Sequence, residues 1–314
     1  MTGMSRPATQ IETAAHAARH WLFPEPGPLR AGTEPHKQVA YRMFHETSNP
    51  YKPSIIDWPR LDPVALARST GLPIWDIAVQ TEGKARLGMR TYGKSLTDPT
   101  WREATERNAW EEGRHKDVLS NPVATYGIQL APELVYRESH DPEWAYLVTG
   151  FSECVDSFFA FGLFEMAKRS GFFPSEPVDT FEPVIQEEAR HILLFANWLA
   201  WHRRRLTMWR RIWFELRVAA VWVFLACERI GIARGMSANA GKPTDNNFTL
   251  TGSKSVSETE IGPADLMAIC LAKNDRRFAG YDNRLLRPTT TPAIAGLVCW
   301  RARRRHRGMA GDGP

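Results

Sequence analysis

The sequence predicts an all-α protein, built as a four-helix bundle with extra helical segments before and after it. Three observations support this prediction: long stretches with helical periodicity, turns containing proline or glycine between them, and a pentapeptide Glu-Glu-x-Arg-His that occurs twice. With 314 residues and 43% hydrophobic content, the chain can bury a large core. We expect an N-terminal extension at 1–72, the bundle with a fifth helix at 73–232, a flexible linker at 233–262, and a C-terminal helical segment with a basic tail at 263–314.

The first hairpin of the bundle is predicted from Pro73 onward. Apolar and small side chains recur at steps of three and four up to about residue 96, and Glu82 interrupts this stripe. A turn at Thr97-Asp98-Pro99 precedes a second helix that carries Glu112. Glu82 lies 15 residues before the turn and Glu112 lies 13 residues after it. An antiparallel hairpin therefore places the two carboxylates at similar depth.

A second hairpin follows the same plan. A long apolar helix is predicted from Pro142 to Ser170, then a break at Gly171-Phe172-Phe173-Pro174, then a helix that carries Glu188. The long helix offers three acidic residues as the matching carboxylate: Glu153, Asp156 and Glu165. Depth and chain spacing rank them in that order, because Glu165 lies about two turns too close to the break. Pairing with a nearby base explains Glu165 better than metal binding.

The repeated pentapeptide carries the chemistry. Its copies are Glu111-Glu112-Gly113-Arg114-His115 and Glu187-Glu188-Ala189-Arg190-His191. Residues three apart share a helix face, so each copy can present a carboxylate and an imidazole to one metal ion. Two solvated, charged helix faces are the alternative explanation. Glu111 and Glu187 point about 100° away from the ligands, and we expect ordinary ion pairs there, with Arg114 and Arg190 as candidate partners.

Electrostatics favours metal over an empty acidic cluster. Four buried carboxylates without counter-charge repel one another and lose hydration worth several kcal/mol each, so they must take up protons or cations. Two divalent ions cancel four negative charges. Ligation by glutamate and histidine without thiolate suits iron or manganese, whereas structural zinc more often uses cysteine.

The order Glu82, Glu112-x-x-His115, Glu153, Glu188-x-x-His191 resembles the ferritin-like di-iron carboxylate superfamily, which includes rubrerythrins, the ribonucleotide reductase small subunit, soluble acyl desaturases and bacterial multicomponent hydroxylases. The resemblance covers about residues 73–200 and implies a ferritin-like bundle with two Fe ions, or Mn at one or both positions. It implies that Glu82 and His115 are terminal ligands of one ion, Glu153 and His191 of the other, and that Glu112 and Glu188 bridge them. The chain departs from the short ferritin pattern by its long segments on both sides.

A basic and aromatic region lies between Trp198 and Arg217, and a second basic cluster lies at 300–307. Together they account for much of the net charge of +5. Such a region can bind an acidic carrier protein or a membrane surface, or it can be a solvated helix end and turn. Nucleic acid is not an expected partner, because no nucleic-acid-binding motif accompanies the charge. A homodimer is a further expectation.

The remaining features bound the location and the cofactors. The first 30 residues lack the apolar run of a signal peptide, and four cysteines without close spacing suggest free thiols, so we expect a cytoplasmic protein, peripheral to the membrane if the basic region binds lipid. The apolar stretch Val218–Cys227 is too short to cross a bilayer and predicts a buried fifth helix to about Gly231. Composition predicts a mobile linker at Ser237–Glu260 and a helix at Pro263–Phe278. No nucleotide-binding fingerprint is present, so electrons must come from an external reductase or ferredoxin.

Three functions follow as hypotheses. The first is a di-iron oxygenase or oxidase that hydroxylates, desaturates or N-oxygenates a small apolar or carrier-bound substrate. The second is iron binding without an organic substrate, as in ferroxidase, storage or peroxide-scavenging proteins. The third is a non-catalytic protein that binds a partner through the basic and aromatic region. The length of the chain and the aromatic third helix favour the first.

Overall fold

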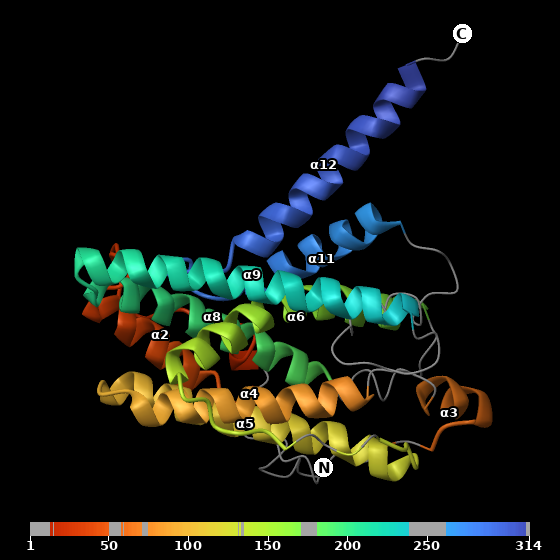
Figure 1. Ribbon diagram of the computed structural model, residues 1–314, viewed down its shortest axis with the longest axis horizontal. Helices are drawn as coiled ribbons and strands as arrows, with labels where there is room; N and C mark the ends of the chain where they lie inside the picture. Colours follow the sequence, from red (N-terminus) through yellow and green to blue (C-terminus); the bar gives the residue numbers. More distant parts are fainter. Residues whose placement is uncertain are drawn as a thin grey trace, which may run out of the picture.

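The computed structural model describes residues 13–14, 16–49, 58, 60–70, 75–130, 132, 135–170, 181–238 and 262–311. The all-α prediction is confirmed for this part of the chain, which contains helices and, apart from one bridge between Trp21 and Tyr281, no β-structure. The helices are α2 (Glu34–Glu46), α3 (Pro63–Thr70), α4 (Trp75–Ser95), α5 (Pro99–Thr125), α6 (Pro142–Ser170), α8 (Glu182–Arg205), α9 (Met208–Ala238), α11 (Pro263–Phe278) and α12 (Thr290–Gly311) (Figure 1).

The four predicted bundle helices are α4, α5, α6 and α8. The turn between α4 and α5 lies at the predicted residues: the Asp98 side chain accepts a hydrogen bond from the backbone N–H of Trp101, and Pro99 occupies the first turn. An acidic N-cap accepts a hydrogen bond from an amide that the helix leaves unpaired, and proline in the first turn has no N–H that needs a partner. Helix α6 has the predicted bounds, whereas the break at 171–174 lies outside the described residues. The two hairpins predicted from sequence thus supply the bundle helices.

The segment at 1–72, predicted as an extension, contributes a helix to the core. Helix α2 packs against α8 and α5. Its inward side chains Val39, Ala40, Met43 and Phe44 are fully buried. Their spacing, two adjacent pairs four residues apart, is that of a helix with one apolar face. The bundle is therefore larger than the region 73–232 that carries the motifs.

Helix α9 differs from the buried fifth helix predicted. One face packs into the core through Phe214, Val218, Val221 and Leu225. Its opposite face carries large apolar side chains that are exposed to solvent, which the sequence prediction of full burial did not allow for. The helix also continues to Ala238, past the predicted end of the bundle at 232. The rest of the predicted linker, 239–261, lies outside the described residues.

Helix α6 lies in the interior of the bundle. It contacts α4, α8, α9 and α11. By length and composition, Pro142–Arg169 is the one stretch of the described chain apolar enough to cross a membrane, and half of its most apolar window is buried inside the protein. Neighbours on several sides explain the composition, because a helix surrounded by other helices is apolar over most of its circumference.

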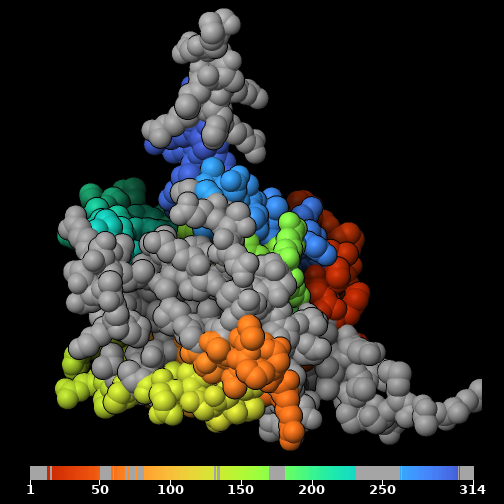
Figure 2. Space-filling model, turned by 90° about the vertical axis from the view of Figure 1, so that its right-hand side faces the viewer, coloured from red at the N-terminus to blue at the C-terminus, as the bar shows by residue number. Residues whose placement is uncertain are grey.

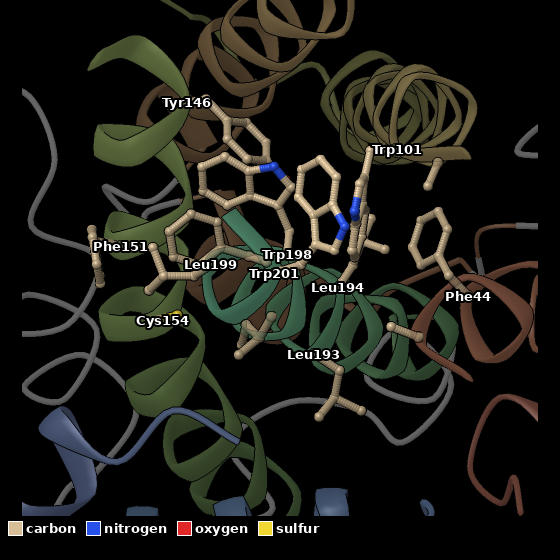
Figure 3. Close-up of a cluster of buried hydrophobic side chains, with 14 of the residues drawn as sticks. Phe44, Trp101, Tyr146, Phe151, Cys154, Leu193, Leu194, Trp198, Leu199 and Trp201 are labelled. Carbon is tan, nitrogen blue, oxygen red and sulfur yellow. The ribbon is translucent and has the colours of Figure 1, made fainter. Parts of the chain in front are cut away.

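An aromatic cluster fills the bundle between α2, α5, α6 and α8 (Figure 3). The ring of Tyr146 on α6 stacks on Tyr92 of α4, with centroids 4.4 Å apart. Tyr146 also meets Trp198 of α8 edge to face at 4.7 Å. Phe151 contacts Phe195 in the same way at 5.0 Å. Much of the aromatic content noted in the sequence therefore serves as core packing, with geometries that aromatic pairs prefer.

The C-terminal segment is attached to the bundle and to the N-terminal segment. Helix α11 packs on α6, and Arg277 of α11 binds Glu182 at the start of α8 with 2.6 Å between the guanidinium and the carboxylate. Beyond it, the backbones of Trp21 and Asp282 are joined by a hydrogen bond of 2.8 Å. Helix α12 contacts α11 and then projects away from the bundle (Figures 1 and 2). Both chain ends thus contribute to one folded unit.

Gly150 of α6 lies against the ring of Phe195 on α8, and a Cβ atom there would overlap that ring. We therefore expect Gly150→Ala to lower the free energy of unfolding by about 1–3 kcal/mol, since the two helices must separate or the ring must move. Urea unfolding followed by circular dichroism measures this change. Gly296→Ala in α12 is the matched control, because its Cβ would meet nothing within 4 Å. Equal effects of the two substitutions would contradict the packing described here.

Candidate metal centre

Four of the predicted ligands gather between α5 and α8: Glu112, His115, Glu188 and His191. One ligand atom from each lies within 4.8 Å of the others. Each helix contributes one glutamate and one histidine from the same face, because residues three apart lie one turn apart. Both histidines are fully buried, and their rings stack with centroids 5.3 Å apart. The two Glu-x-x-His pairs form one buried cluster, consistent with a di-iron carboxylate motif.

Within the cluster, each histidine faces the glutamate of the opposite helix. The Nδ1 atom of His191 lies 2.7 Å from Oε1 of Glu112. The Nδ1 atom of His115 lies 3.1 Å from Oε1 of Glu188. The two helices therefore meet through these four side chains, and each pentapeptide supplies half of the cluster.

Glu82 and Glu153, the predicted ligands on α4 and α6, lie beside these four residues. The Oε2 atom of Glu82 is 3.7 Å from Nδ1 of His115. Burial raises the pKa of Glu82, but interactions with His115 and Glu112 outweigh it and leave the pKa below its usual value. Both carboxylate oxygens of Glu153 are buried without a hydrogen-bond partner, and Glu188 and Glu82 act on it as nearby charges.

The carboxylates of the cluster oppose one another's ionisation. Burial raises the pKa of Glu112 well above its usual value, and the charges of Glu153, Glu82 and Glu188 raise it further. Burial followed by the charges of Glu188 and Glu82 does the same to the pKa of Glu153. Like charges at this depth are tolerated only with bound protons or cations. The cluster is therefore built to take up positive charge.

Outside the cluster, the other residues of the pentapeptide connect the two copies. Glu187 binds Arg114 of the first copy, and its Oε2 accepts a hydrogen bond from Nε2 of His115 at 2.8 Å. In the same way, Oε2 of Glu111 lies 2.9 Å from both the guanidinium of Arg190 and Nε2 of His191. The expected ion pairs with Arg114 and Arg190 are confirmed, but they are not ordinary surface pairs, because both glutamates are fully buried and their shortest contacts join the two copies.

The contact with Glu111 indicates which nitrogen of His191 carries hydrogen. Glu111 is held as a carboxylate by Arg190, and its pKa lies well below the usual value although burial opposes this. A carboxylate can only accept a hydrogen bond, so Nε2 of His191 must donate. In the neutral ring, Nδ1 then presents a lone pair to Oε1 of Glu112, and neither atom has a hydrogen-bond partner. Two facing acceptors require a proton or a metal ion between them, so the donor set fits a cation.

The two alternative acids on α6 have other partners. Asp156 accepts hydrogen bonds from Arg229 at 2.6 Å and from Ser152 at 2.9 Å. Glu165 lies 2.6 Å from Arg169 and 2.7 Å from Lys273, as expected for an acid paired with nearby bases. Of the three candidates on this helix, Glu153 is the one whose carboxylate oxygens both lack a hydrogen-bond partner.

Sequence reasoning missed the contribution of α2 to the surroundings of the site. The guanidinium of Arg190 donates to Oγ of Thr47 at 2.7 Å and to the carbonyl of Phe44. Ser48 donates to Oε1 of Glu111 at 3.1 Å. The apolar spacing within α2 could have predicted its helix, but no sequence signal indicated that its end reaches the histidine-bearing helices.

We compared the chain with known proteins at three levels. No family model, no curated protein and no solved structure matched it. The assignment of the site therefore rests on the residues and their geometry: an all-helical bundle with a buried Glu-x-x-His pair from each of two helices.

Proposed function

We propose that this chain is a non-haem di-iron oxidoreductase that activates dioxygen and oxidises a small apolar or carrier-bound organic substrate, by hydroxylation, desaturation or N-oxygenation. The observation that carries the proposal is the buried cluster of two imidazoles and their opposed glutamates, with further acids beside it. Such a donor set, rich in carboxylates and free of thiolate, suits iron or manganese.

The ligand set of the proposal combines the four clustered residues with Glu82 and Glu153. It thus has one carboxylate from each of four helices and two imidazoles: Glu82, Glu112, His115, Glu153, Glu188 and His191. Two bound iron ions would supply the reduction of dioxygen, with electrons from a separate reductase or ferredoxin.

The residues around the ligands prepare the site for that chemistry. Glu111 and Glu187 contact Nε2 of His191 and His115, so that the Nδ1 atoms would be the ones to bind the ions. Arg114 and Arg190 balance the charge of these two acids. The apolar and aromatic side chains between α6 and α8 exclude water and so strengthen the electrostatic interactions inside. Cation binding must displace the protons held by Glu112 and Glu153, so affinity rises with pH.

Anaerobic loading with ferrous iron tests the proposal. We expect about two iron ions per chain and, after exposure to air, near-ultraviolet absorption of a di-ferric centre. Glu112→Ala and His191→Ala should lose both, because each removes a ligand and leaves the others too few. Glu106→Ala is the control, since Glu106 is exposed on the same helix as Glu112. Unchanged iron content in the ligand variants would reject the assignment.

Oxygen consumption then separates oxidation of a substrate from simple iron handling. We expect catalytic oxygen uptake with a reductant when fatty-acyl or aromatic compounds are supplied, with oxidised product in proportion. If oxygen uptake instead stops once the bound iron has been oxidised, whichever compound is supplied, the function is iron binding or ferroxidase activity.

A further inference from the structure

From Trp209 to Ile230, the outer face of α9 is apolar. Taking one hundred degrees per residue, the side chains opposite the core are those of Trp209, Ile212, Leu216, Ala219, Ala220, Val223, Cys227 and Ile230. None carries a charge, and all eight are exposed; Trp209 is 71% exposed and Val223 63%. From Trp209 to Ile230 this outer face extends for about 32 Å. The helix is thus apolar on both its inner and its outer face.

A helix of this composition is normally covered on all sides. Between Met208 and Ile230 the charged residues lie on the two flanks between the faces, and several pair with other side chains there: Arg217 binds Asp141 and Glu143, and Arg229 binds Asp156. Figures 1 and 2 place α9 at the outside of the molecule. A contiguous exposed apolar surface of this size indicates a site that binds another protein or a membrane.

The chain around the start of α9 is strongly basic. Arg204 and Arg205 end α8, and Arg210 lies in the first turn of α9; all three are exposed. Within the described residues none of the three has an acidic partner, whereas the neighbouring Arg203 binds Glu215 at 2.8 Å. Two exposed tryptophans, Trp209 and Trp213, lie at the same end, each 71% exposed. The apolar face therefore begins with exposed aromatic side chains, and three exposed arginines lie close to its start in the chain.

From this arrangement we infer that α9 binds the surface of an anionic lipid bilayer, lying in the plane of the interface with its outer face in the acyl region. Tryptophan prefers the interface, and arginine reaches lipid phosphates while its apolar stem stays in the headgroup layer. A second copy of the chain fits less well, because each copy carries a net charge of +5 and the unpaired arginines would gain no acidic partner. An acidic carrier protein would match the arginines but leave the long uncharged face uncovered.

Co-sedimentation of the full chain with vesicles tests the inference, independently of metal. We expect binding to vesicles of phosphatidylcholine with phosphatidylglycerol, and much weaker binding to phosphatidylcholine alone. The triple substitution Arg204→Gln, Arg205→Gln and Arg210→Gln should weaken binding to the anionic vesicles about a hundredfold. Its control removes three exposed arginines elsewhere, Arg19→Gln, Arg30→Gln and Arg276→Gln, and should bind within about twofold of the natural chain.

A second triple substitution addresses the apolar face: Trp209→Ser, Trp213→Ser and Val223→Ser. We expect at least about a tenfold loss of vesicle binding. The control Leu22→Ser, Val64→Ser and Val135→Ser removes equally exposed apolar side chains elsewhere and should not change binding. All changed residues are exposed, so circular dichroism should show unaltered folding.

Two results would overturn the inference. One is failure of the natural chain to bind anionic vesicles, or binding that both α9 variants retain. The other is self-association in analytical ultracentrifugation that the α9 apolar variant abolishes while vesicle binding is absent, which would assign the face to a second copy.

Discussion

Glu153→Gln should stabilise the metal-free protein at neutral pH and at the same time abolish its response to metal. Burial and the charges of Glu188 and Glu82 raise the pKa of Glu153 well above its usual 4.5. This carboxyl therefore favours the metal-free fold below about pH 4.5, and that contribution is lost as pH rises toward the folded-state pKa. Glutamine keeps the shape without the charge, so we expect a gain of about 2–3 kcal/mol in the free energy of unfolding near pH 7.

Urea unfolding at several pH values, with and without ferrous or manganous ion, measures both effects. Without metal, the free energy of unfolding of the natural chain should fall as the pH rises above 4.5, and added metal should restore it. In the Glu153→Gln variant this free energy should fall less with pH, and added metal should not raise it. Glu165→Gln is the control on the same helix, since Glu165 is paired with Arg169 and Lys273 at a distance from the cluster. A metal response retained by Glu153→Gln would remove this residue from the ligand set.

Arg190→Leu should be among the most damaging single changes in the chain. The guanidinium is fully buried and binds Glu111, Thr47 and the carbonyl of Phe44. Its loss leaves the buried carboxylate of Glu111 without its arginine, so the pKa of that group must rise and the fold loses about 3–5 kcal/mol in free energy of unfolding. The hydrogen bond that fixes His191 also weakens, so metal affinity should fall about 10–100-fold.

Arg169→Leu provides the comparison, because Arg169 pairs with Glu165 at 2.6 Å while 66% of its side chain is exposed. An exposed pair of this kind contributes about 0–1 kcal/mol. Unfolding in urea and metal titration should therefore separate the two arginines clearly. If the two variants were equally stable, the buried network between the pentapeptides would have no energetic role.

The cluster of Glu112, His115, Glu188 and His191 was predictable because each Glu-x-x-His pair is local in sequence. A glutamate and a histidine three residues apart share a helix face wherever the helix lies. The two copies of the pentapeptide therefore predicted a site that is shared by two helices. Depth matching in antiparallel hairpins, which needs only helix rise and turn positions, singled out Glu82 and Glu153, and their role as ligands belongs to the proposed function. The turn at Asp98 was predictable because its capping chemistry is equally local.

Other features depended on contacts between distant segments. The pairing of Glu187 with Arg114 and of Glu111 with Arg190 joins residues more than seventy positions apart, and no spacing rule distinguishes it from an ion pair within one copy. The contacts of α2 and of the residues that follow it with Arg190 and Glu111 could not be predicted either, because they also join segments far apart in the sequence. For α9, periodicity could not separate a helix buried on all sides from one whose apolar outer face is exposed.

The sequence by itself thus determined the all-α class, the main helices and the residue types offered to a metal, because helix periodicity, capping and ligand spacing act over a few residues. Only the tertiary structure decided which acids are unpaired at the centre, which bases neutralise the others, and which face of α9 is exposed. Those outcomes depend on burial and on Coulomb interactions between segments far apart in the chain, and both exist only once the helices have packed.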